Sequence, residues 1–260
     1  MKQAMILAAG LGTRLRPLTD TMPKALVPVG GKPLLAHVIE RLQAAGYERV
    51  VVNVHHKADQ IEQYLRVNRY FGLDMAISDE REQLLDTGGA LKKAAPLFDP
   101  DEPVLIHNVD ILDNVDYEWL HREHLPDEDA LLLVSRRQTK RYLLFDSAMR
   151  LMGWANRDTG EVKSPYPWLR NADITIDDAM RVTATSLPVQ FAAFAFSGIH
   201  SVSPRLFPLM ERFPDHFSII DFYLSTCHRS RIMGCIKDDL RILDVGKLGA
   251  LEQAETFLKT

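Results

Sequence analysis

The sequence predicts an α/β protein with a Rossmann-like, three-layer α/β/α arrangement, in which helices cover both faces of a mostly parallel mixed sheet. Two observations predict this class. Short apolar segments typical of buried strands alternate with helical segments through the first half of the chain, and the stretches between successive strands are long enough for crossover connections. The chain has 260 residues, of which 46% are hydrophobic, so we expect a single domain over 1–260 with a sizeable core.

The elements of this alternation follow one another in a regular order. Residues 49–54 (RVVVNV) are β-branched and continuous, which indicates a strand buried on both faces. Gly46 follows the helix expected at 33–45, as is favoured just after a helix. We expect strands at 3–9, 49–54, 74–78, 104–109 and 130–135, and helices at 33–45, 58–66, 88–95 and 117–125. The loops after residues 9, 54 and 109 should then share the carboxyl edge of the sheet, where such sheets bind ligands.

The pattern changes from about residue 136. Residues 142–146 and 151–154 look like a hairpin, and 155–188 are polar without clear periodicity. We interpret 136–190 as a lobe or lid inserted over the edge of the sheet. The chain returns to the core at 191–202, followed by helices at 203–213 and 218–229, strands at 231–236 and 241–245, and a closing helix at 247–258.

Composition excludes several classes of protein. The net charge of −4 gives no global attraction to nucleic acid or to a membrane surface. No apolar run approaches the roughly 20 residues of a membrane span, and the apolar stretch near the N-terminus is too short for a signal peptide. The two cysteines, Cys227 and Cys235, lack the spacing of a zinc site. We therefore expect a reduced, cytoplasmic protein.

The loop after the first strand carries the strongest functional signal. Gly10 and Gly12 allow the backbone to turn sharply and approach a ligand, and backbone N–H groups at such a turn can hold phosphate oxygens. Arg14, Arg16 and Lys24 add three cations within eleven residues. The loop thus predicts a polyphosphate site, and a tight turn with solvated arginines is the alternative.

Two other glycine-rich motifs fit this loop less well. A dinucleotide-binding fingerprint needs a third glycine where Leu15 stands, and a P-loop needs Gly-Lys-Ser/Thr at its end. A dehydrogenase is therefore the least favoured function.

Two further segments of the same edge carry polar or small residues. Thr87, Gly88 and Gly89 open a helix and permit close approach of a flat base, although a helix start capped by Asp86 is the simpler alternative. Asp110 follows a buried strand, where its carboxylate could anchor a hard cation such as Mg²⁺.

The segments LAAGLGTRLRPLT and PKALVPVGGKPL resemble the signature of the sugar-1-phosphate nucleotidylyltransferases, or nucleotide-sugar pyrophosphorylases. The short single-domain form is most similar to N-acetylmuramate-1-phosphate uridylyltransferases and mannose-1-phosphate guanylyltransferase-like proteins. The resemblance is strong over 3–65 and good at 84–112 and 191–208. It implies the nucleotide-diphospho-sugar transferase fold, with a small sugar-binding lobe.

The resemblance also implies roles for individual residues. Arg14, Lys24 and Asp110 would be catalytic, with Lys24 stabilising the α-phosphate. Asp110 and Asp244, the latter in a late Asp-x-Gly motif, would hold Mg²⁺, although Val109 stands where the family has glycine. The residues implied for nucleotide binding are Leu7, Ala8, Ala9, Gly10, Gly12, Thr13, Arg14, Thr87, Gly88, Gly89 and Asn108.

The resemblance identifies the residues of the sugar site least clearly. Ser197 and Gly198 match a strand that carries small residues near the sugar. The Glu-Lys pair of the family has candidates in Glu161 and Lys163, with Asn156 as a further one. A solvated hairpin explains those three residues equally well. The role of Asp221, inside an apolar helical segment, is left open.

The expected activity is transfer of NMP from an NTP, with UTP or GTP favoured, to a sugar 1-phosphate, with release of pyrophosphate. The alternatives are a phosphocholine cytidylyltransferase-like enzyme, in which Trp154, Tyr166 and Trp168 would form an aromatic cage, and a non-catalytic nucleotide-sugar-binding regulatory protein. We expect no nucleic acid or membrane partner and a monomer or small homo-oligomer. The base and the sugar are left open.

Overall fold

The computed structural model describes residues 1–177, 180–184 and 190–259. Its centre is a parallel group of four strands in the order β6 (Val104–Asn108), β1 (Gln3–Leu7), β4 (Arg49–Val54) and β5 (Asp74–Asp79). In the register of this group Leu7 lies beside both Asn53 and Asn108. The carboxyl ends of β1, β4 and β6 therefore lie at one edge, as the sequence predicts.

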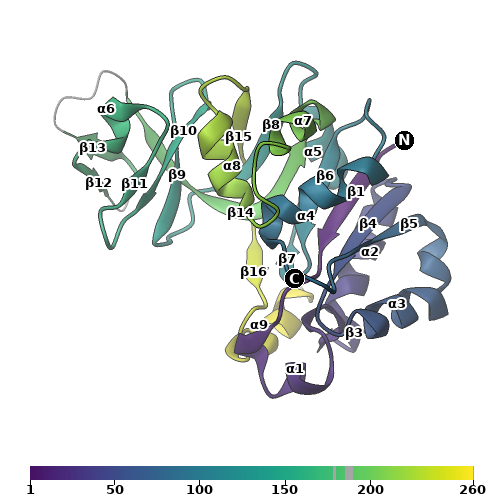
Figure 1. The fold of residues 1–260 in the computed structure, drawn as a ribbon. Helices are drawn as coiled ribbons and strands as arrows, with labels where there is room; N and C mark the ends of the chain where they lie inside the picture. Colours follow the sequence, from purple (N-terminus) through teal and green to yellow (C-terminus); the bar gives the residue numbers. More distant parts are fainter. Residues whose placement is uncertain (178–179, 185–189, 260) are drawn as a thin grey trace.

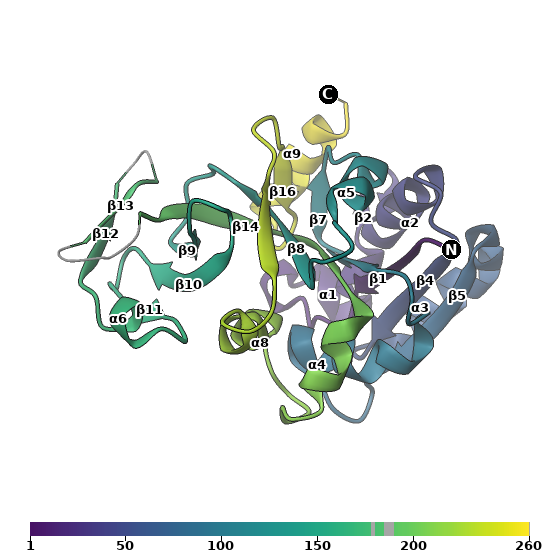
Figure 2. The same ribbon diagram turned by 90° about the horizontal axis from the view of Figure 1, so that it is seen from above.

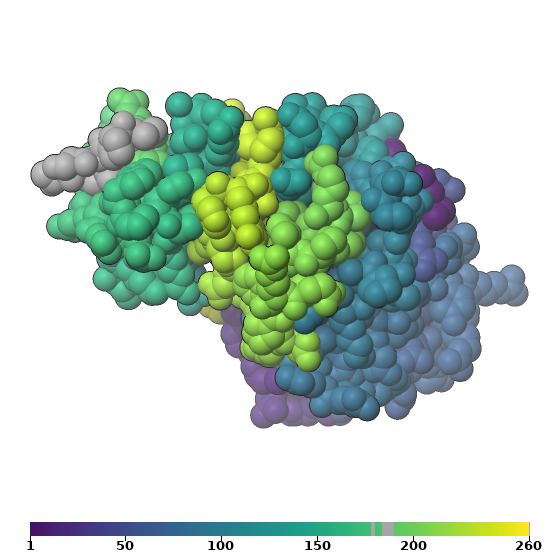
Figure 3. All heavy atoms as spheres, turned by 45° about the horizontal axis from the view of Figure 1, so that its top comes forward, coloured from purple at the N-terminus to yellow at the C-terminus, as the bar shows by residue number. Residues whose placement is uncertain are grey.

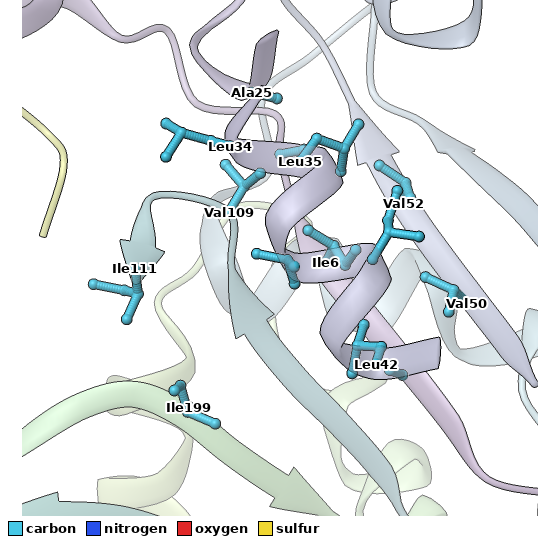
Figure 4. Packing of buried hydrophobic residues seen from close by; sticks show 14 of the residues in the cluster. Ile6, Ala25, Leu34, Leu35, Leu42, Val50, Val52, Val109, Ile111 and Ile199 are labelled. Atoms are coloured by element: carbon cyan, nitrogen blue, oxygen red, sulfur yellow. The ribbon is translucent and has the colours of Figure 1, made fainter. Parts of the chain in front are cut away.

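Helices cover both faces of this group, because alternate side chains of each strand point to opposite faces. Ala4 and Ile6 of β1 pack on the side of α2 (Leu34–Ala44), α3 (Ala58–Val67) and α5 (Tyr117–Glu123). Met5 packs on the other side, with α4 (Asp86–Ala94) and α8 (Ile219–Thr226). Figures 1 and 2 show the resulting three layers. Figure 4 shows Leu34, Leu35 and Leu42 of α2 packed over Ile6, Val50 and Val52. The predicted three-layer α/β/α fold is confirmed.

A long antiparallel strand, β14 (Ala192–Val202), extends the sheet and makes it mixed. Its second half pairs with β6 and with β8 (Ala130–Ser135), and its first half pairs with β9 (Arg141–Phe145). Beyond β8 lies β15 (Ile232–Ile236), parallel to it. β14 is thus a shared element between the parallel strands and the region inserted between β8 and β14.

The inserted region forms a distinct lobe at one end of the molecule (Figures 2 and 3). The expected hairpin is present as β9 and β10 (Leu151–Asn156). The lobe also contains β11 (Val162–Lys163), α6 (Pro167–Arg170), β12 (Ile174–Ile176) and β13 (Val182–Ala184). It has a small core of its own, including Tyr142, Leu144 and Leu169. Part of the predicted segment 136–190 lies outside the described residues, and its boundaries stay a prediction.

Several short elements were not predicted. Among them are α1 (Leu18–Thr21), the hairpin of β2 (Pro28–Val29) and β3 (Lys32–Pro33), and β7 (Ile111–Asp113). The strand predicted at 241–245 is present as β16 (Ile242–Asp244), which pairs with β7, and the predicted closing helix is α9 (Gly249–Phe257). The helix predicted at 203–213 is wrong in length, because α7 covers Phe207–Met210 after a 3₁₀ turn at Pro204–Leu206. Pro204 and Pro208 have no N–H group to donate to a longer helix.

Candidate active site

The loop that follows β1 and contains Gly10, Gly12 and Arg14 is called the opening loop, and its two glycines have different environments. Gly12 has φ of +64°, and a Cβ there would lie 2.8 Å from Thr19 Cγ2 and 2.9 Å from Lys24 Cβ. The Thr19 hydroxyl donates a 2.9 Å hydrogen bond to the Gly12 carbonyl. Gly10, by contrast, has nothing within 4 Å of the position that a Cβ would take, and its φ is not positive. Gly12 is needed by the fold of the loop, whereas the described residues place no steric demand on Gly10.

Lys24 and Asp110 meet beside this loop. The Lys24 ammonium forms an ion pair with Asp110 Oδ2, and both side chains are largely buried, at 11% and 16% exposed. Lys24 belongs to a 3₁₀ turn that follows Pro23, and Asp110 follows β6 across the sheet edge. Two residues 86 positions apart in sequence, both predicted to act on the nucleotide, are therefore in direct contact.

The pairing of β16 with β7 brings the second aspartate to the same place. Asp244 lies opposite Ile111, and the Val245 N–H donates a 2.8 Å hydrogen bond to the Asp110 carbonyl. A Cβ on Gly246 would lie 2.6 Å from Asp244 Oδ1 and 2.8 Å from Arg14 Nη2. The structure therefore brings the segments that carry Arg14, Lys24, Asp110 and Asp244 to one region beside the opening loop.

This donor set fits a hard divalent cation. Among the described residues, no group of three or more His, Cys, Asp or Glu side chains is arranged to hold a metal ion. Asp110 and Asp244 nonetheless supply two carboxylates from adjacent backbone segments. Mg²⁺ commonly takes one or two protein carboxylates and completes its shell with water and phosphate oxygens. Magnesium binding by Asp110 and Asp244 stays a prediction that the arrangement supports.

Asn108, Ser197 and Gly198 lie next to this cluster. Gly198 has φ of +81°, and a Cβ there would lie 2.8 Å from Asn108 Nδ2. The Ser197 hydroxyl lies 3.1 Å from the Ile199 nitrogen and 3.2 Å from its carbonyl oxygen, and the residue is buried. Asn108 is therefore packed against β14, and the Ser197 hydroxyl has partners within the chain. Contact of Ser197 with a sugar stays a prediction.

Gly88 and Gly89 are approached closely by the chain itself. A Cβ on Gly88 would lie 2.4 Å from the Phe217 ring, and one on Gly89 would lie 1.9 Å from the Asp215 carbonyl oxygen. Both backbone N–H groups donate to the Phe217 carbonyl, at 2.9 and 3.2 Å, and Thr87 Oγ1 accepts from the Ile219 N–H. The sequence predicts that these glycines let a nucleotide base approach the backbone. In the structure the space beside them is filled by the segment before α8. Contact with a base stays a prediction.

The alternative of an Asp86 cap is also not observed. Asp86 has φ of +60° and accepts a 2.6 Å hydrogen bond from its neighbour Thr87. It therefore begins α4 without capping its later amides.

A cavity of about 480 Å³ lies between the lobe and α8. The three candidate sugar residues, Asn156, Glu161 and Lys163, all line it. Asp221, whose role the sequence left open, lines it too, with its Oδ1 3.5 Å from Lys163 Nζ. Arg137, Arg141 and Phe196 are further lining residues. Because Phe196 precedes Ser197 and Gly198 on β14, this strand leads from the cavity to Asn108.

The aromatic cage expected for a choline group is not formed around this cavity. Trp154 lines it, but Lys163 Nζ already lies 5.3 Å from the centre of the Trp154 ring. Tyr166 and Trp168 pack together with ring centres 5.6 Å apart, and Trp168 stacks on Phe191. The arrangement gives no support to the phosphocholine alternative.

A buried polar cluster that the sequence did not reveal supports β7. Asp113 Oδ2 lies 3.0 Å from His107 Nε2 and 2.7 Å from Arg41 Nη1, and it accepts a 2.8 Å hydrogen bond from the Tyr117 hydroxyl. Burial opposes the charge of Asp113, but the His107 hydrogen bond and the Arg41 charge outweigh it and lower its pKa to about 2. His107, a polar residue inside the otherwise apolar start of the run VLIHNV, was the available signal.

Comparison with known proteins relates the first half of the chain to a family. Residues 3–143 match the family described as nucleotidyl transferase. The chain is 53% identical over 111 residues to N-acetylmuramate alpha-1-phosphate uridylyltransferase of Caulobacter vibrioides, covering 42% of this chain and 46% of that protein. It is 37% identical over 145 residues to mannose-1-phosphate guanyltransferase of Neurospora crassa, covering 54% and 39%. The chain thus spans less than half the length of these relatives.

Solved structures are similar over the whole chain. HddC from Yersinia pseudotuberculosis has a TM-score of 0.67 at 22% identity, covering 99% of this chain and 100% of that one. UDP-glucose pyrophosphorylase complexed with UDP-glucose has a TM-score of 0.70 at 16% identity, covering 100% and 98%. At these identities the similarity concerns the fold. In the part of the chain that the structure describes, helices long and apolar enough to span a membrane are absent.

Proposed function

Because the chain belongs to the nucleotidyl transferase family, we propose that it transfers NMP from an NTP to the phosphate of a sugar 1-phosphate and releases pyrophosphate. One observation carries this proposal. Lys24 forms an ion pair with Asp110, and the side chains of Arg14 and Asp244 both approach Gly246. The neighbouring Val245 N–H donates to the Asp110 carbonyl, so four segments of the chain bring these charges to one region beside the opening loop. Such a site has the charges that a polyphosphate and its divalent ion require, and a regulatory protein without catalysis would not need all four.

The chemistry asks for positioning and charge rather than for a general base. The acceptor phosphate is ionised near neutral pH, so its oxygen can attack the α-phosphorus directly. Lys24 would hold the α-phosphate, and Arg14 would draw negative charge from the departing pyrophosphate. The open space beside Gly10 leaves room for the triphosphate to approach the backbone.

Asp110 and Asp244 would hold Mg²⁺ in this site. When bound, the ion would neutralise charge on the phosphate oxygens and orient them. The hydrogen bond from the Val245 N–H to the Asp110 carbonyl holds the backbone segments that carry the two aspartates side by side.

The lobe cavity would take the sugar. Asn156 and Glu161 lie on opposite sides of a tight turn, since the Asn156 N–H donates a 2.9 Å hydrogen bond to the Glu161 carbonyl. Lys163, on the same hairpin, and Asp221, on α8, would offer opposite charges to sugar hydroxyls. Asn108 and Gly198 lie where β14 leads from this cavity towards Asp110.

We favour UTP or GTP as the nucleotide, because the relatives reported above are named as a uridylyltransferase and a guanyltransferase. The sugars in those names differ, so substrate choice needs direct measurement. The test is a matrix of four NTPs against a panel of sugar 1-phosphates, read by magnesium-dependent pyrophosphate release. Absence of release from every pair would contradict the proposed function.

Lys24→Ala sharpens the same test. Loss of one charge contact to the transition state should lower turnover about a hundredfold. Lys32→Ala is the control, because Lys32 forms an ion pair with Glu40 outside the site, where both side chains are more than 40% exposed. Equal turnover of the two variants would contradict the role given to Lys24.

A further inference from the structure

A buried chain of hydrogen bonds joins the opening loop to the start of α4. The Ala8 N–H donates to Asn53 Oδ1 at 2.6 Å, and Asn53 Nδ2 donates to Glu80 Oε1 at 2.8 Å. The other carboxylate oxygen, Glu80 Oε2, accepts from the Leu85 N–H at 3.1 Å. Asn53 is 2% exposed and Glu80 is 1% exposed. Two side chains thus connect three segments that are distant in sequence.

The topology explains why these two residues can do this. Asn53 lies near the end of β4, beside Leu7 of β1 on one side and Ser78 of β5 on the other. Glu80 comes just after β5, where its own N–H donates to the Val54 carbonyl at 2.7 Å. The side chains therefore point along the carboxyl edge of the sheet, across the ends of β1, β4 and β5.

Burying a carboxylate at position 80 carries a desolvation cost. Burial raises the pKa of Glu80 above its ordinary value, while the hydrogen bonds from Asn53 and Leu85 act in the opposite direction. Its hydrogen-bonding partners, Asn53 and Leu85, are both neutral donors. An apolar side chain would avoid the desolvation cost but could not hold both donors.

We infer that Glu80, acting through Asn53, is a positioning residue that fixes the separation between the two segments that bind the nucleotide. Ala8 begins the loop for the triphosphate, and Leu85 immediately precedes the segment 86–89 expected near the base. This inference rests on the proposed function. A ligand that spans both segments depends on their separation, whereas a ligand that contacts one of them does not.

The test uses a pair of exchanges at the two positions. In Glu80→Gln one acceptor oxygen becomes an amide donor and meets a second donor, so the chain of hydrogen bonds is broken. When Asn53→Asp is combined with Glu80→Gln, the carboxylate moves to the position on β4 and the amide to the position after β5. The carboxylate would then accept from the Ala8 N–H and from the new amide, whose oxygen would still accept from the Leu85 N–H. The double exchange restores every hydrogen bond in reversed order and keeps the net charge of the pair.

Glu128→Gln is the matched control. Glu128 is also buried, with its Oε2 accepting a 3.1 Å hydrogen bond from the Leu125 N–H, and burial raises its pKa as well. It lies just before β8. The first residues of β8 and β6 both pair with Val202 of β14, so these two strands begin at the same edge of the sheet. Glu128 is therefore at the edge of the sheet opposite the site.

The readout is the affinity of the whole chain for Mg²⁺-UTP, Mg²⁺-GTP and inorganic tripolyphosphate, measured by calorimetry. Glu80→Gln should weaken binding of the favoured NTP about tenfold and leave tripolyphosphate binding unchanged, and the double exchange should restore NTP binding. Hydrogen exchange at peptides covering Ala8 and Leu85 should rise and recover in parallel. The inference would be overturned if the wild type is active and Glu80→Gln binds the NTP as tightly as the wild type does. It would also be overturned if Glu80→Gln loses no more affinity than Glu128→Gln. A wild type without turnover would instead overturn the proposed function beneath it.

Discussion

The opening loop and the start of α4 both carry two glycines at the carboxyl edge of the sheet, yet the glycines serve different purposes. At α4 the chain itself fills the space, because Phe217 and Asp215 lie where side chains on Gly88 and Gly89 would be. In the opening loop Gly12 is required by the turn, whereas Gly10 faces open space. The same residue type thus indicates internal packing at one site and leaves room for a ligand at the other.

This difference shows how a glycine motif should be interpreted. A glycine that a protein needs for its own packing is costly to replace whether or not a ligand exists. A glycine with free space around it is cheap to replace for folding, so any loss of function on replacement points to something outside the chain.

Gly89→Ala should have the largest effect. The new Cβ would meet the Asp215 backbone, which cannot move without displacing the segment before α8. We expect the free energy of unfolding to fall by about 3 kcal/mol, measured by urea denaturation. Gly249→Ala, at the start of α9 with nothing within 4 Å, should change it little. A Gly89→Ala protein as stable as the control would remove the basis of the comparison.

Gly12→Ala should have the next largest effect. It combines a positive φ with contacts to Thr19 and Lys24, so unfolding should become easier by about 2 kcal/mol. Gly72→Ala is a control for the backbone conformation alone, because Gly72 has φ of +72° in open space. If both variants lose the same stability, the contacts of Gly12 contribute nothing.

Gly246→Ala should change stability by less than about 0.5 kcal/mol, because its nearest neighbours are the ends of two side chains rather than backbone atoms. Those ends belong to Asp244 and Arg14, so displacing them should lower turnover about tenfold. Steady-state kinetics beside Gly249→Ala provide the measurement. Unchanged kinetics would show that the placement of Asp244 and Arg14 beside Gly246 has no role in the reaction.

Gly10→Ala should have the smallest effect on folding. Alanine restricts the unfolded chain and meets no atom in the folded one, so stability should rise by about 0.5 kcal/mol. Nucleotide affinity should nevertheless fall about tenfold, because the methyl group would occupy the space proposed for the triphosphate. Calorimetric titration with the favoured NTP checks this. Unaltered affinity would place the ligand elsewhere.

Much of the fold follows from local patterns. The β-branched run at 49–54 is β4 with the predicted bounds, and the amphipathic segment at 58–66 lies within α3. A strand at 241–245 is predicted, but its pairing with β7 could not be, because the two strands lie about 130 positions apart and β7 is too short to show a period.

The candidate site likewise contains residues that local motifs predict and residues whose role depends on distant contacts. Arg14, Lys24, Asp110 and Asp244 lie in motifs that are visible locally, and the structure brings them together. Glu80 and Asp113 are buried through contacts that also involve other elements, Asn53 on β4 and Arg41 on α2, and their positions in the sequence alone do not show that burial. The packing of Gly88 and Gly89 depends on Phe217 and Asp215, which lie more than 120 residues further along the chain.

The contact between Lys24 and Asp110 has a consequence for how metal and nucleotide reach the protein. A tethered ammonium already neutralises the carboxylate, so a free Mn²⁺ ion must compete with it for the same oxygen. In the proposed site, a triphosphate would offer the ammonium another anion and would leave the carboxylate to the metal. Each ligand should therefore strengthen binding of the other, by the same factor in both directions. Paramagnetic resonance of Mn²⁺ would detect this as tight uptake with nucleotide and weak uptake without it, while a Lys24→Met protein should take up Mn²⁺ alone.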